Sequence, residues 1–128
     1  MSDANAHEFK EGEVWTYRTR PGESTSTLLI NKIESKLNFG QVFHISVRGV
    51  SIKNPRAPGG VTTNLPHFPV SRKTLEDSAL ELVRSEVPDP CYLEGYEQWK
   101  QAFESGKAGV FTISVAEIVG VIEQTVNR

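Results

Sequence analysis

Apolar and polar side chains alternate between residues 12 and 52 in the way that is typical of consecutive β-strands. The alternation is cleanest at Phe43, Ile45 and Val47, which fall on one side of an extended chain. A polar set falls on the opposite side: His44, Ser46 and Arg48. We therefore predict an antiparallel meander of three strands over residues 12–52, with the Phe43 side facing the core.

Two turn signals divide this meander into strands. Pro21 and Gly22 suit the central positions of a β-turn, because proline presets φ and glycine accepts a positive φ. The segment 38–40, Asn-Phe-Gly, separates the second strand from the third. The uninterrupted apolar run at 28–30 indicates that the second strand is covered on both faces and is central in the sheet.

The composition changes at residues 53–69, where four of the seven prolines lie. Proline removes a backbone donor from a strand ladder, so we expect a loop here with at most a short edge strand at Val61–Thr63. Long ordered loops often carry function. This loop is the first place where the sequence suggests a binding site.

Helical spacing appears after residue 70. Ser71 is a good N-cap, and apolar residues recur at helical spacing as far as about Arg84, so we predict a first helix there. A second helix is expected over about 93–105, where Tyr96, Trp99 and Phe103 form one stripe. These aromatic side chains should cover the sheet.

The C-terminal segment predicts a strand followed by a helix. Residues 108–113 alternate in a way that favours a strand. Ser114 and Glu117 then form a capping box, in which each side chain bonds the backbone amide of the other residue. A last helix should follow, running to about Val126.

Together these elements predict an α+β fold. We expect a twisted antiparallel sheet of four or five strands, which could curl toward a half-barrel, with three helices packed on it in the order βββ(β)ααβα. Residues 12–128 should form a single domain, because 128 residues is a common size for one core. Residues 1–11 should be a flexible polar leader.

Composition and charge narrow the class of protein. No apolar run approaches the roughly 20 residues that span a bilayer, and the N-terminus lacks the features of a secretory signal, so we predict a cytoplasmic protein with no membrane contact. The net charge of −2 is unevenly distributed. Residues 1–73 carry ten Lys or Arg against six Asp or Glu, and residues 74–128 carry four against ten.

The basic residues of the meander are the candidate binding residues. Arginine pairs well with carboxylate and phosphate through two parallel N–H donors, and antiparallel neighbours bring such side chains within reach of one another. A protein partner or a second copy of the chain is the expected occupant, and a small anionic ligand is an alternative. The predicted partner-binding set joins four residues of the meander to two of the adjoining loop: Arg18, Arg20, His44 and Arg48, with Arg56 and His67.

Other chemistry finds less support in the sequence. The chain lacks the Cys and His spacings of metal sites, and we predict no metal, no cofactor and no catalytic residue. Cys91 stands near the start of the second predicted helix, where a lowered thiol pKa would make it a nucleophile, but an unpaired cysteine is more often a packing residue. An enzyme that uses His44 or His67 as general base is one alternative.

Binding of single-stranded nucleic acid by a small β-barrel is a further alternative. The pI of about 5.9 argues against it, and so does the expected lack of exposed aromatic residues interleaved with the basic ones.

Three segments resemble a family of small uncharacterised bacterial proteins: Gly12–Glu23, Leu65–Ser71 and Gly106–Ile113. The resemblance spans nearly the whole chain and implies a bacterial single-domain protein, with no activity to transfer. The leading hypothesis rests on a complete core pattern, the lack of a catalytic motif and a basic sheet face beside a Pro/Gly-rich loop. It is a small binding or accessory protein that acts through protein–protein contacts, as an immunity-type or regulatory partner.

Overall fold

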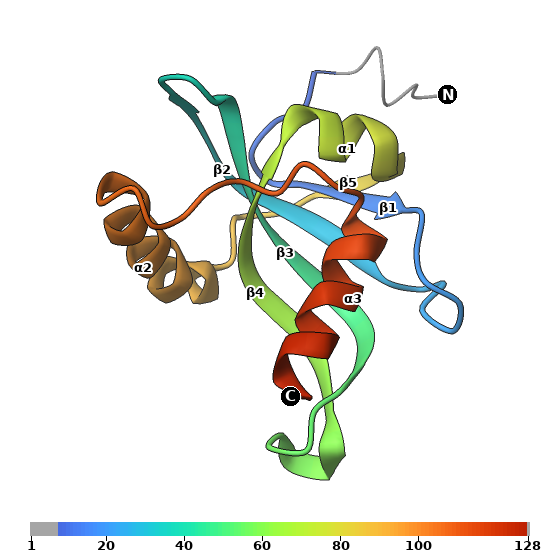
Figure 1. Cartoon of the computed structure of the whole chain (residues 1–128). Helices are drawn as coiled ribbons and strands as arrows, with labels where there is room; N and C mark the ends of the chain where they lie inside the picture. Colours follow the sequence, from blue (N-terminus) through green and yellow to red (C-terminus); the bar gives the residue numbers. More distant parts are fainter. Residues whose placement is uncertain (1–7, 128) are drawn as a thin grey trace.

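The computed structural model describes residues 8–127, which form one open antiparallel sheet with three α-helices (Figure 1). The strands are β1 (Glu13–Tyr17), β2 (Thr27–Lys36), β3 (Gly40–Lys53), β4 (Val61–Ser71) and β5 (Ala79–Ser85). The helices are α1 (Arg72–Ser78), α2 (Leu93–Glu104) and α3 (Val115–Val126), with two short 3-10 turns, η1 (Pro58–Gly60) and η2 (Pro90–Tyr92). The sheet order is β4-β3-β2-β1-β5, so the sheet does not close into a barrel. The predicted α+β class is confirmed.

The predicted meander is confirmed as β1, β2 and β3. Leu28 of β2 pairs with Trp15 on one side and Val47 on the other, which makes β2 an interior strand. Gly22, at φ +85°, occupies the turn between β1 and β2 in the left-handed conformation that glycine tolerates.

The Pro-rich segment is more ordered than we predicted. Residues 61–71 form a strand of 11 residues along β3, although they include Pro66 and Pro69. The strand lies at the sheet edge, and the carbonyl of Pro69 accepts from the amide of Phe111, on the side away from β3. Proline is tolerated there because its missing N–H is not needed for pairing with β3.

The first helix is shorter than predicted. Ser71 is its N-cap and accepts from the amide of Thr74, as expected, but α1 ends at Ser78. The next seven residues form β5, which pairs with the edge of β1 through two register shifts. Residues 79–84 form a strand despite their helical spacing, because the edge of β1 has unpaired backbone N–H and C=O groups. Pairing with β5 satisfies these groups.

The strand predicted at 108–113 does not form. Only an isolated parallel bridge joins Phe111 to Val70, and the segment is otherwise an extended connection. The capping box of Ser114 and Glu117 is confirmed, and α3 ends at Val126 as predicted.

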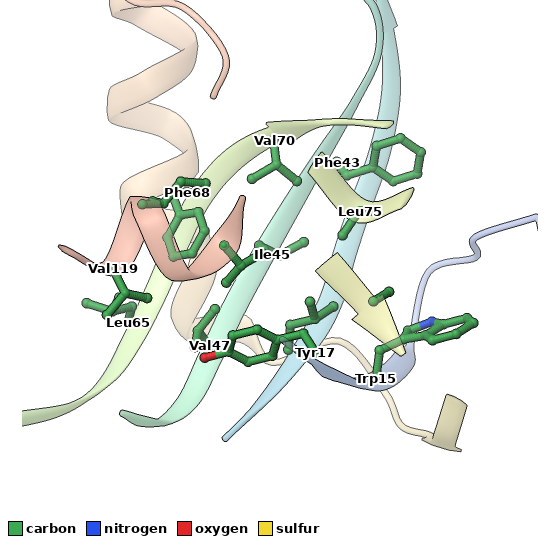
Figure 2. Packing of buried hydrophobic residues seen from close by; sticks show 14 of the residues in the cluster. Trp15, Tyr17, Phe43, Ile45, Val47, Leu65, Phe68, Val70, Leu75 and Val119 are labelled. Carbon is green, nitrogen blue, oxygen red and sulfur yellow. The ribbon is translucent and has the colours of Figure 1, made fainter. Parts of the chain in front are cut away.

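The main core lies between one face of the sheet and the helices α1 and α3 (Figure 2). Phe43, Ile45 and Val47 of β3 are completely buried there, as the alternation predicted. Phe9 also belongs to this core, with its ring 5.3 Å from the ring of Trp15. The packed chain therefore begins at or before Phe9 and not at residue 12, while residues 1–7 of the predicted leader lie outside the described part.

Helix α2 covers the opposite face of the sheet, apart from α1 and α3 (Figure 1). Tyr96 and Trp99 are buried against Val42 of β3, which confirms that these aromatic residues cover the sheet. Within residues 8–127, none of the helices has both the length and the apolar character needed to cross a bilayer.

Candidate functional site

The candidate site is the polar face of β3, on the side that carries α2. Three alternate residues, His44, Ser46 and Arg48, project from this face. The first lies completely buried under α2, the second is buried, and the third is partly exposed at the mouth of a cleft. The row therefore leads from the interior of the protein to its surface.

His44 is the centre of a buried hydrogen-bonded chain. Its Nε2 lies 3.0 Å from Oε1 of Glu34 on β2, and its Nδ1 lies 2.9 Å from Nε2 of His67 on β4. Because an ionised carboxylate only accepts, His44 carries its proton on Nε2 and accepts at Nδ1. It follows that Nε2 of His67 is the donor to His44, and that His44 is neutral in this arrangement.

Helix α2 completes this chain. The Tyr96 hydroxyl donates to Oε2 of Glu34 at 3.0 Å, and the rings of Tyr96 and Trp99 both pack edge-on to His44, with centroids 4.8 Å away. Gly95 brings the helix backbone close to His67, since a Cβ atom at this glycine would lie 3.0 Å from the Cβ of His67. Absence of a side chain at position 95 allows this approach.

Burial and charge set the protonation of the chain. Burial lowers the pKa of His44 below its usual value, against the opposing effect of Glu34. Burial, with the neighbouring charge of His44, lowers the pKa of His67 to about 4. Burial raises the pKa of Glu34, but the hydrogen bonds from His44 and Tyr96 outweigh it and leave that pKa below the usual value. At neutral pH the group is two neutral imidazoles beside one carboxylate.

The second residue of the row, Ser46, ties the sheet to the η2 turn. Its hydroxyl accepts from Nδ2 of Asn31 and donates to the carbonyl of Pro66, both at 2.7 Å. The side-chain oxygen of Asn31 accepts in turn from the amide of Asp89 at 3.0 Å. These bonds fix the position of the η2 turn beside β3 and β4.

A cleft of about 190 Å³ opens where the row reaches the surface. It lies between β3 and β4 on one side and the η2 turn on the other, and Asp89 and Cys91 line it from that turn. Arg48 and Asn64 contribute polar side chains from the strands, whereas neither histidine lines this cleft. Its volume suits a side chain or a small polar group better than an extended cofactor.

Arg48 is held at the cleft by acidic neighbours. Its Nη1 donates to both carboxylate oxygens of Glu86, at 3.0 and 3.2 Å, and its Nη2 makes a longer ion pair of 3.6 Å with Asp89. Arg84 also donates to Glu86, at 2.7 Å. The N–H donors on the guanidinium edge toward Asp89 therefore make only this weaker ion pair.

Cys91 does not have the properties of a nucleophile. A hydrogen bond to Asp89 and the charge of that carboxylate raise the pKa of the Cys91 thiol above its usual value, so it stays protonated at neutral pH. Its backbone amide also donates to Asp89, at 3.0 Å. The position near α2 does not activate the thiol, because the nearest charge is negative.

The remaining predicted residues do not join this row. Arg20 is paired through its guanidinium with Glu23 and with Glu123 of α3. Arg18 and Arg56 are exposed, the first just after β1 and the second in the loop before η1. The structure thus joins His44 to His67, places Arg48 at the cleft and separates the other three. Their role in partner binding stays a prediction.

Sequence reasoning missed Glu34, Asn31, Asp89 and the part played by Tyr96. One signal could have found Glu34: the hairpin turn at 37–39 dictates the β2–β3 register, in which Glu34 pairs with Val42 and Lys32 with His44. A diagonal neighbour lies within reach of a long side chain in such a ladder. Asp89 had no comparable signal, because its contact with Asn31 spans 58 residues.

No metal site is evident in the described part of the chain, where no three His, Cys, Asp or Glu residues are grouped so as to hold an ion.

Compared with known proteins, the chain matches no family model, no curated protein and no solved structure. The resemblance to small uncharacterised bacterial proteins therefore stays a prediction.

Proposed function

We propose that this protein is a small cytoplasmic binding or accessory protein that acts through protein–protein contacts, and that its partner docks at the cleft beside Arg48. The observation that carries the proposal is the cleft itself, which places Arg48, Asp89 and Asn64 around a small concave surface. Opposite charges at its rim suit a partner segment that brings both a carboxylate and a hydrogen-bond donor.

The geometry of Arg48 supports this assignment. Glu86 holds one side of the guanidinium through two hydrogen bonds, which orients the planar group before a partner arrives. The opposite side has only the 3.6 Å ion pair with Asp89, so a partner carboxylate can compete for those donors. A pre-oriented arginine loses less side-chain entropy on binding than one that is mobile.

The test compares capture of partner proteins from the native lysate by the wild type and by Arg48→Gln, followed by mass spectrometry. This change removes the charge but leaves Glu86 paired with Arg84. We expect the captured partner to bind roughly 30-fold more weakly, since loss of one member of a hydrogen-bonded charge pair at an interface costs about 2 kcal/mol or more.

Lys107→Gln is the matched control, because it removes the same charge from an exposed segment that does not line the cleft. It should retain the partner at nearly wild-type affinity. Equal weakening by both variants would mean that general basic charge, and not the cleft, attracts the partner. Unchanged capture by Arg48→Gln would refute the proposed interface.

A further inference from the structure

Helix α2 is attached to the sheet by a small contact of its own. Its buried residues, Tyr96 and Trp99, form a cluster with Val42 that is separate from the main core under α1 and α3. Two connections bound the helix, the η2 turn before it and the segment 105–114 after it. A unit with few apolar contacts can open while the main core stays folded.

The two histidines lie at the centre of that contact. Their rings are stacked, with centroids 5.1 Å apart and planes inclined by 16°, and one hydrogen bond of 2.9 Å joins them. Tyr96 packs edge-on to both rings, and Gly95 lies directly against His67. A change in the protonation or position of the two histidines therefore directly alters the contacts that hold α2.

This hydrogen bond requires that one of the two facing nitrogens is without a proton. When both imidazoles are protonated, each ring nitrogen is a donor, the bond is lost and two positive charges are in contact. The other charged groups around the pair can offset only one of these charges. On β2, Glu34 favours a proton on His44, whereas Lys32 and Lys36 oppose it.

The groups on α2 do not offset the second charge either. Tyr96 faces Glu34, and its pKa is raised to about 12 by burial and by its hydrogen bond to that carboxylate, so it stays neutral at acidic pH. Glu97 of α2 acts on Tyr96 and is not among the groups that shift either histidine. The positive charge of a second proton on the histidine pair is therefore not offset by these groups.

We propose that the His44–His67 pair is an acid-sensitive latch for α2, which holds the helix on the sheet while at least one of the two imidazoles is neutral and releases it when both are protonated. Release would uncover Trp99 and the buried part of the polar row while β1–β5 remain packed against α1 and α3. The conformational change is thus confined to one face of the sheet.

The direction of the pH dependence follows from the lowered pKa of His67. Its value is about 4 with α2 in place and 6.5 for an unperturbed histidine, so the released state binds the proton more tightly. The contribution of the neutral imidazole to closure is complete above about pH 6.5 and is lost as the pH falls toward 4. The ratio of closed to open α2 should fall by about 100-fold between pH 7 and pH 4.

Hydrogen exchange measured by mass spectrometry between pH 7 and pH 4 tests the latch, after correction for the intrinsic pH dependence of exchange. Amides in α2 should lose protection by about 100-fold, whereas amides in α3 should keep most of theirs. Constant protection of α2 would refute the latch, as would parallel loss in α2 and α3, which would mean that the whole domain unfolds.

Variants identify the group responsible. His67→Gln keeps a hydrogen-bond donor but cannot take up a proton, so the response of α2 should disappear. His7→Gln is the control, since it removes a histidine outside the described residues and should leave the response unchanged. Retention of the wild-type response by His67→Gln would overturn the assignment.

A second variant covers the case in which His67→Gln does not fold. Glu34→Gln removes the carboxylate that offsets the first proton, so both imidazoles become harder to charge while α2 is closed. Opening should then begin at a higher pH than in the wild type. An unchanged or lower opening pH would contradict the latch.

Discussion

The two faces of β3 are both buried, but different interactions stabilise the side chains on each. Phe43, Ile45 and Val47 are buried under α1 and α3 among apolar neighbours, and contact area is enough to stabilise them. On the other face His44 and Ser46 are equally hidden, but each requires specific partners at hydrogen-bond distance. Adjacent residues of one strand therefore depend on apolar contact on one face and on hydrogen bonding on the other.

The difference teaches what each face contributes. Apolar burial is non-directional, so the main core supplies most of the stability without specifying one arrangement of polar groups. Hydrogen bonds on the other face are directional and fix the positions of α2 and the η2 turn through Glu34 and Asn31. In the described part of the chain no buried side-chain nitrogen or oxygen is left without a partner, so this network is complete.

The largest expected effect comes from the apolar face. Phe43→Ala should lower the free energy of unfolding by about 3–5 kcal/mol, because it removes a completely buried ring and leaves a cavity. Urea denaturation followed by circular dichroism measures this loss. Phe39→Ala is the control, since that ring is 49% exposed at the hairpin tip and its removal should cost under about 1.5 kcal/mol. Similar losses for both rings would contradict the role given to the main core.

A smaller effect is expected from the polar face. His44→Leu should cost about 2 kcal/mol, because a side chain of comparable size fills the space but leaves Glu34 and His67 without their shared partner. Tyr96→Phe removes only one hydrogen bond of the network and should cost about 1 kcal/mol. Both values come from the same denaturation assay. If His44→Leu were as stable as the wild type, directional bonding would not distinguish this face from the apolar one.

The smallest expected effects come from replacing one glycine in the helix on each face of the sheet. Gly120→Ala in α3 meets no atom within 4 Å and should stabilise the protein by about 0.5–1 kcal/mol, as alanine favours a helix. Gly95→Ala gains the same propensity but brings a methyl group 3.0 Å from His67, so crowding should cancel the gain or exceed it, for a net loss of up to about 1 kcal/mol. Thermal unfolding compares the two. Equal stabilisation by both changes would show that α2 does not press on His67.

Much of the fold could be predicted from local pattern. The period-two alternation at 43–47 identified the core face of β3, and the capping box at Ser114 and Glu117 located the start of α3. These features are decided by residues close together in sequence, through the pleat of a strand or the orphan amides of a helix. The sequence likewise indicated that β2 is central.

The candidate site was predicted only in part. His44 and Arg48 were expected on an exposed basic face of the sheet and His67 on the loop beside it. The structure instead buries His44, pairs it with His67 and leaves only Arg48 at the cleft. No single segment carries this information, since the partners come from three strands and from α2. A polar residue on an alternating strand shows which side it faces but not what covers that side.

The amino-acid sequence by itself determined the meander, the N-caps of α1 and α3 and the apolar face of the sheet, because each depends on interactions between near neighbours. Tertiary structure decided that Ala79–Ser85 is a strand, that Pro66 and Pro69 lie in an edge strand, and that two histidines meet under α2. The physical reason is the same in all three cases. Backbone and side-chain polar groups must find partners when they are buried, and those partners were supplied by parts of the chain that are distant in sequence.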